Sequence, residues 1–107
     1  MPYILDRQTT SELQQWVMEM ISGNQYQKQR DSLSLFAETV PDKVRAACGY
    51  SQIESVKIIP SADMEAGGFL ALRTRTSKQE RDIGLDIWLC PYVSPELLGK
   101  ALELLEI

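Results

Sequence analysis

The chain has 107 residues, of which 44% are hydrophobic and 24% charged, and its formal net charge is −4. This size and composition predict one domain over residues 1–107 and exclude an intrinsically disordered chain. The acidic balance argues against a nucleic-acid binder, since such proteins need clustered Lys and Arg. No apolar stretch approaches the roughly 20 residues that span a bilayer, and the first residues do not resemble a signal peptide. We therefore expect a cytoplasmic protein without membrane contact.

The first helix is predicted from Thr9 to Gly23. Thr9 and Glu12 have the spacing of a capping box, with Thr9 as the N-cap. Apolar residues then recur at the helical spacing, at Leu13, Trp16, Val17, Met20 and Ile21. Trp16 lies on this apolar stripe, so we expect it in the core. Gly23 is expected to end the helix in the left-handed conformation.

Two more helices are predicted before the first strand, and one at the end of the chain. Asn24 can cap a second helix that runs to about Thr39, with sparse apolar positions. Pro41 fits the start of a short third helix that ends at Gly49. Ser94, followed by a proline and an acidic residue, is a strong start for the last helix, which is rich in leucine.

Three strands are predicted between the third and the last helix. Residues 53–59, 69–76 and 83–90 are rich in β-branched and apolar residues, and a charged loop over 77–82 joins the second strand to the third. The predicted fold is therefore α+β, with the order α-α-α-β-β-β-α and a three-stranded, mainly antiparallel sheet packed by helices.

The alternation of residues suggests how the last two strands pair. If Thr76 lies opposite Ile83, one face of the hairpin is almost wholly apolar, and we assign that face to the core. The other face then pairs Arg73 with Asp86 and places Trp88 opposite Ala71. Opposite charges across an antiparallel ladder are favourable, which supports this register.

The composition restricts the chemistry that the chain can perform. It contains no histidine and only two cysteines, Cys48 and Cys90, which lie far apart in the sequence. Histidine-based nucleophilic catalysis is thereby excluded within the chain, and a tetrahedral zinc site is disfavoured. The glycines form neither a phosphate-binding loop nor a dinucleotide fingerprint. We predict no catalytic residue, metal or cofactor, and two reduced, buried cysteines rather than a disulfide.

A protein-binding function is the first interpretation of what remains. On the outer face of the predicted hairpin, Phe69, Arg73, Asp86 and Trp88 would lie together, and Trp and Arg are enriched where interfaces gain most binding energy. The alternative is that helices cover this face and Trp88 belongs to the core. We predict a non-enzymatic acidic interaction protein, such as an adaptor, an inhibitor or an immunity-type partner of another protein. The leucine-rich last helix also leaves a homodimer open.

A winged-helix nucleic-acid binder is the second interpretation. Three helices followed by a β-hairpin match its outline, and the 73–81 hairpin would act as a basic wing through Arg73, Arg75, Lys78 and Arg81. Against it, Glu80 and Asp82 dilute the positive charge at the tip of the hairpin. A solvated turn explains the charged residues more simply.

Overall fold

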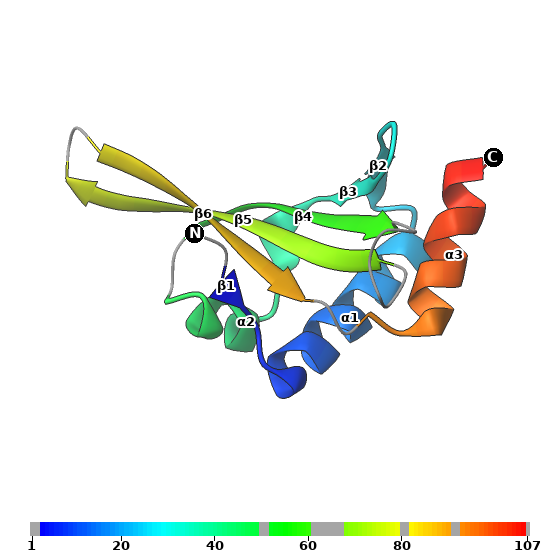
Figure 1. Ribbon diagram of the computed structural model, residues 1–107, viewed down its shortest axis with the longest axis horizontal. Coiled ribbons are helices and arrows are strands. Elements are labelled where there is room, and N and C mark those ends of the chain that lie inside the picture. Colours follow the sequence, from blue (N-terminus) through cyan, green and yellow to red (C-terminus); the bar gives the residue numbers. More distant parts are fainter. Residues whose placement is uncertain (1–2, 50–51, 61–67, 80–81, 91–92, 107) are drawn as a thin grey trace.

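The computed structural model describes residues 3–49, 52–60, 68–79, 82–90 and 93–106, and side chains outside residues 76–86. In this part of the chain the fold is α+β, with three α-helices and one six-stranded mixed sheet (Figure 1). The elements, in chain order, are β1 (Tyr3–Ile4), α1 (Arg7–Ser22), β2 (Tyr26–Lys28), β3 (Leu33–Leu35), the 3-10 helix η1 (Ala37–Thr39), α2 (Asp42–Ala47), β4 (Gln52–Pro60), β5 (Gly68–Gln79), β6 (Asp82–Cys90) and α3 (Pro95–Glu106).

The predicted three-stranded sheet and its element order are wrong. The strand order is β1-β6-β5-β4-β3-β2, antiparallel except where β1 runs parallel to β6. The three additional strands have only two or three residues each, too short for alternation to show in the sequence. The three central strands β4, β5 and β6 contain the predicted ones.

The largest error is the second predicted helix, from Asn24 to Thr39. That segment forms the hairpin of β2 and β3 followed by η1. Leu33 and Leu35 are both buried and Ser34 lies between them, which is the period of a strand and not of a helix. Asn24 has a φ of 56°, so it turns the chain in the left-handed conformation that was predicted for Gly23, whose φ is −91°.

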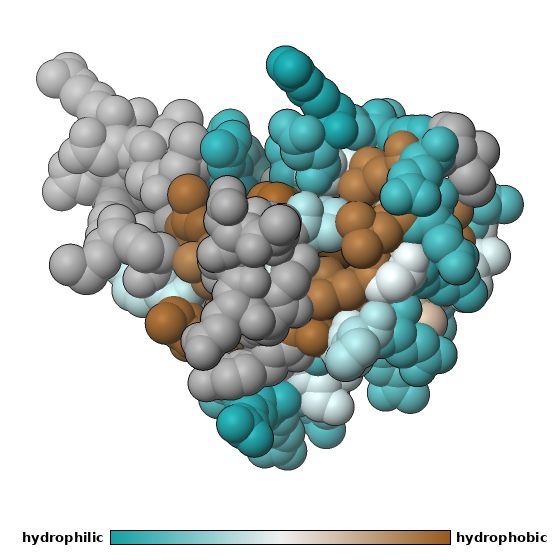
Figure 2. Space-filling view, turned by 45° about the vertical axis from the view of Figure 1, so that its right-hand side comes forward, coloured by the Kyte–Doolittle hydropathy of each residue, from teal (hydrophilic) through white to brown (hydrophobic). Residues whose placement is uncertain are grey.

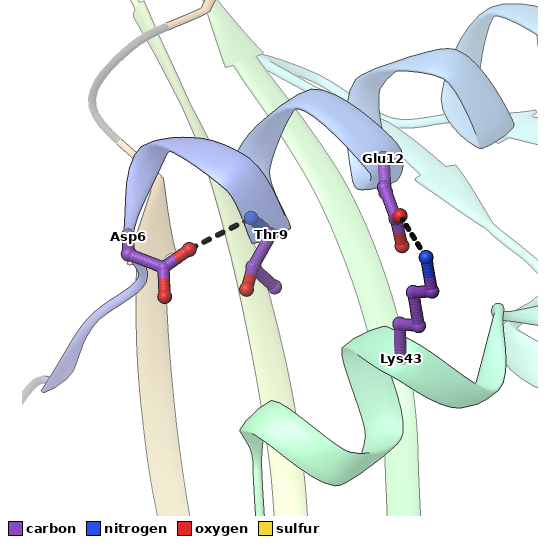
Figure 3. A network of polar contacts seen from close by, with 4 residues as sticks. All are labelled: Asp6, Thr9, Glu12 and Lys43. Carbon is purple, nitrogen blue, oxygen red and sulfur yellow. Dashed lines mark hydrogen bonds and ion pairs between the residues drawn. The ribbon is translucent and has the colours of Figure 1, made fainter.

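The first helix forms where it was predicted but begins earlier. Asp6, and not Thr9, is its N-cap: the Thr9 backbone N–H donates to Asp6 Oδ1 at 2.7 Å (Figure 3). This hydrogen bond lowers the pKa of the Asp6 carboxyl. Glu12 does not close a capping box; its Oε1 accepts from Lys43 Nζ at 3.0 Å and thereby links α1 to α2 (Figure 3).

The short helix and the last helix are confirmed. α2 begins after Pro41, and Gly49 follows it with a left-handed φ of 69°. The Leu97 backbone N–H donates to Ser94 Oγ at 3.2 Å, so Ser94 caps α3 as predicted. The Ser94 backbone N–H in turn donates to Gln14 Oε1 at 2.6 Å, which fixes the start of α3 against α1.

All three helices lie on one side of the sheet (Figure 1). The buried core contains residues of α1, α2 and α3 together with every second residue of β4 and β5. It is formed by Leu13, Trp16, Val17, Val44, Val56, Ile58, Leu70, Leu72, Leu97, Leu98 and Ala101, among others. Trp16 is core, as predicted. No helix of the described residues is long and apolar enough to cross a bilayer.

The hairpin of β5 and β6 pairs one residue out of the predicted register. Arg73 lies opposite Ile87, and Thr74 lies opposite Asp86, so the predicted Arg73–Asp86 pair is wrong. The charged segment 77–82 is mostly strand, not loop, and a bulge between Ser77 and Gln79 shifts the pairing by one position. A slip of one residue turns β6 over with respect to β5, so the face of β6 that contacts the core is also reversed.

Candidate functional site

The sheet has one face that no helix of the described residues covers. Along β5, Leu70, Leu72 and Thr74 are fully buried against the helices, whereas Phe69 and Ala71 are half-buried and Arg73 is exposed. The same alternation holds on β4. We call the side chains on this side the open face: Ile4, Ser55, Lys57, Ile59, Phe69, Ala71, Arg73, Ile87 and Leu89.

Ala71 lies at the centre of the open face. Lys57 on β4 and Leu89 on β6 flank it across the sheet, and Phe69 and Arg73 precede and follow it on the same side of β5. Since alanine has only a methyl group and its neighbours are all larger, the surface is hollowed above Ala71. The depression has a volume of about 460 Å³, and most of its lining side chains are apolar.

Apolar side chains extend the open face toward β1. Ile87 is 44% exposed, and Ile4, which lies in register with Leu89, is 69% exposed. Burying such side chains is favourable by about 25 cal/mol per Å² of apolar surface. A contiguous exposed apolar surface of this kind is typical of an interaction site.

The open face also carries positive charge. Lys57 and Arg73 are diagonal neighbours across β4 and β5, a relation that places residues about 7–8 Å apart. Neither forms an ion pair with a carboxylate of the described residues, and no open-face residue named above is acidic. In a chain with a net charge of −4, this surface has the opposite sign.

Trp88, a predicted binding residue, lies on the core side of the sheet. Its Nε1–H donates to the buried Thr74 Oγ1 at 2.9 Å, and its ring stacks on Tyr3 with centroids 4.6 Å apart. Trp88 is thus partly buried against the core, but not because helices cover both faces, as the alternative supposed: the described helices cover one face, and the changed register turns Trp88 toward it. Of the four predicted residues, only Phe69 and Arg73 lie together on the open face. Trp88 lies on the other side of the sheet, and the side chain of Asp86 lies outside the described part.

Of the predicted basic wing, only Arg73 and Arg75 have side chains in the described part of the chain. They lie on the same side of β5, where Arg75 Nη2 forms an ion pair with Glu54 Oε1 at 2.6 Å, whereas Arg73 has no such partner among the described residues. The side chain of Lys78 and all of Arg81 lie outside the described residues. The run of three helices that suggested a winged-helix fold is absent from the described residues, because β2, β3 and η1 replace the second helix.

The two thiols are buried on the core side and are unsuited to nucleophilic chemistry. Cys48 and Cys90 are both free, and burial raises the pKa of each to about 11. At neutral pH both are therefore protonated, and the thiolate is the reactive form. No group of three or more metal-ligating side chains occurs in the described part of the chain.

A second hollow adjoins the open face. It has a volume of about 580 Å³ and lies between β3, η1 and the start of β4, with the 47% exposed Phe36 and the acidic Glu38 and Glu54 in its lining. Ser55 lines both hollows. A ligand on the open face would therefore reach the second hollow directly, past Ser55.

Sequence reasoning missed several residues of this site. Ala71, Lys57, Ile59 and Leu89 were not singled out, because each is unremarkable until the pairing of three strands places them around one point. The available signal was the end of β6, where four apolar residues, Ile87 to Cys90, follow one another. Such a run places apolar side chains on both faces of a sheet.

Hydrophobic surface also occurs on the helical side. Figure 2, which brings α3 forward, shows hydrophobic side chains in the middle of the view and hydrophilic ones along its upper and right-hand margins. On α3 itself, Leu102 is 46% exposed. A single exposed leucine is common on protein surfaces, so it does not define a site as the open face does.

Comparison with family models, with curated proteins and with solved structures finds no match for this chain.

Proposed function

We propose that this chain is a non-enzymatic interaction domain that binds another protein through the open face of its sheet. The observation that supports the proposal is the apolar depression above Ala71, on a sheet face that the described helices leave uncovered. Antiparallel sheets with one solvated face usually present polar side chains there. Here Phe69, Ile87 and Leu89 occupy that face instead, at a cost in free energy that a bound partner would remove.

The roles of adaptor, inhibitor and immunity-type partner all fit such a surface. They differ in what the partner does, and they share the requirement that the open face be free before binding. The half-buried apolar centre and the exposed rim, with Arg73 and Ile87, match the general anatomy of an interface.

Photo-crosslinking in the cells that naturally produce the protein tests the proposal. Phe69 is replaced by p-benzoylphenylalanine, which is similar in shape and lies at the rim of the depression. We expect a covalent adduct with a second protein from this position. The same replacement at Leu102, exposed on the helical side, serves as the matched control and should not give that adduct.

A second substitution makes the crosslinking result specific. Ala71→Glu places a larger, charged side chain in the depression and should abolish the adduct formed from position 69. Because Ala71 does not belong to the buried core, the thermal midpoint of unfolding should stay within a few degrees of the unsubstituted protein. The absence of any adduct from position 69, or an adduct that persists with Ala71→Glu, contradicts the proposal.

A further inference from the structure

We infer that the open face receives an amphipathic α-helix of the partner whose apolar stripe is flanked by carboxylates. This inference rests on the proposed function and specifies the chemistry of the partner. It follows from three features of the open face: its charge, its width and its position in the layers of the fold.

The charge of the open face selects acidic partners. Lys57 and Arg73 lie beside the apolar depression without a carboxylate of the described residues to pair with them. Binding an apolar surface around them removes water from both cations, and burying an unpaired charge is costly. A partner that supplies Asp or Glu at these two positions avoids this cost, whereas a partner with Lys or Arg there increases it.

The same charges argue against a second copy of this chain on the open face. A twofold axis through the depression would bring two equivalent surfaces together. Each would present Lys57 and Arg73, whereas the described acids Glu38 and Glu54 line the adjoining hollow and not the depression. The like charges of the two copies would face each other and repel, which disfavours a homodimer through the open face.

The width of the open face suits a helix. Its apolar residues lie on β4, β5 and β6, and two inter-strand spacings together measure about 10 Å. An α-helix with its side chains is also about 10–12 Å wide. The small Ala71 at the centre, between Phe69 and Arg73 along β5, leaves room for a large apolar side chain of such a helix.

The layers of the fold point to the same occupant. The three helices of the described residues cover only the other face, so a partner helix would complete a helix–sheet–helix sandwich. An extended peptide added to an edge of the sheet would lie beside the strands and not over them. It would leave Phe69 and Ala71 uncovered, so it does not account for the apolar surface.

Binding of designed peptides to the complete chain tests the inference. Three helical peptides of equal length serve as probes: one with a leucine stripe flanked by Glu, one with the same stripe flanked by Lys, and one with the acidic composition scrambled so that no stripe forms. Fluorescence anisotropy at low and at physiological salt measures each affinity. We expect the acidic amphipathic peptide to bind at least tenfold more tightly than either of the others.

Charge reversals locate the site. Lys57→Glu and Arg73→Glu should each weaken binding of the acidic peptide at least fivefold, and the double variant should prefer the basic peptide. Lys100→Glu, an exposed charge on α3, is the matched control and should leave binding unchanged. Equal affinity for the three peptides, no binding of any of them, or binding that ignores Lys57 and Arg73 overturns the inference.

The crosslinking experiment separates this inference from the proposed function. An adduct from position 69 without a preference for the acidic helical peptide would support the proposed interaction domain and contradict the inference of a helical partner. Mass spectrometry of the crosslinked segment gives a second test of the inferred helical partner. A carboxylate-rich helical segment supports the inference, whereas an extended segment, a second copy of this chain or a nucleic acid overturns it.

Discussion

Two tryptophans show how a single hydroxyl can fix a large side chain. Trp88 Nε1–H donates to Thr74 and Trp16 Nε1–H donates to Thr39, at 2.9 and 3.1 Å. The two acceptors differ in their surroundings, since Thr74 is fully buried and Thr39 is exposed. Water can replace the hydroxyl of Thr39 but not that of Thr74, so the two hydrogen bonds should contribute unequally to stability.

Thr74→Val should therefore reduce the free energy of unfolding by about 1–3 kcal/mol, because the Trp88 N–H loses its acceptor at a fully buried position of β5. Thr39→Val, its matched control, should cost less than about 1 kcal/mol. Urea unfolding of both variants gives the two values. Equal losses would mean that the Thr74 hydroxyl has no special role in holding Trp88.

At the scale of residues, the sequence could indicate Trp16 as core but not the side of Trp88. Trp16 lies on a helix whose apolar stripe is unambiguous. Trp88 lies in a run of four apolar residues, so alternation allows either side of β6 to contact the helices. The bulge between Ser77 and Gln79 determines which side of β6 faces the helices, and bulges do not have a strong signature in a single sequence.

At the scale of elements, strands and helices of more than five residues were predictable and shorter ones were not. β4, β5, β6, α1, α2 and α3 each correspond to a predicted element. β2 and β3 gain their stability from pairing with β4, through contacts far away in the sequence, and such tertiary contacts override local preference. The open face depends on the pairing of β3 with β4 only at one margin, where Ser34 lies opposite Lys57.

The start of β5 is the place where one element meets another most closely. A Cβ atom at Gly68 would lie 2.5 Å from Leu98 Cδ2 and 2.9 Å from the backbone oxygen of Ile59. Leu98 could turn away, but the backbone of β4 cannot. Gly68 is therefore required at this end of the β4–β5 pair by the close backbone of β4, and Leu98 of α3 packs against the same point.

Gly68→Ala should lower the free energy of unfolding by about 1–3 kcal/mol, the usual cost of overpacking. Gly99→Ala is the matched control, since a Cβ there meets nothing within 4 Å and lies in the exposed part of α3. It should raise stability by up to about 1 kcal/mol, because alanine favours a helix more than glycine does. Thermal unfolding of both variants measures the contrast, and a harmless Gly68→Ala would contradict the packing described here.

At the scale of the whole molecule, the fold is defined by which face of the sheet the helices cover. The α+β class could be predicted from the switch between helical and strand periods along the chain. The two faces could not be assigned, because both carry Leu and Ile. The open face thus exists only as a consequence of strand pairing, and its one sign in the sequence was the apolar run from Ile87 to Cys90.

Two leucines on opposite faces test this assignment. Leu72→Ala removes a fully buried side chain and should cost about 2–5 kcal/mol. Leu89→Ala, at the half-buried open face, should cost about 1 kcal/mol or less. The predicted register placed both leucines in the core, which would require similar losses of unfolding free energy. An equal decrease of the two denaturant midpoints would therefore support the predicted register and contradict the observed one.

The short β1 strand has a consequence for how the molecule folds. Tyr3 and Ile4 pair in parallel with Trp88 and Leu89, and the Leu5 N–H donates to Leu89 O at 3.0 Å, so the first described strand joins the last. Contacts between distant parts of a chain form slowly, because a long loop must close first. During synthesis β1 therefore cannot pair until β6 has emerged, and until then the open face lacks Ile4.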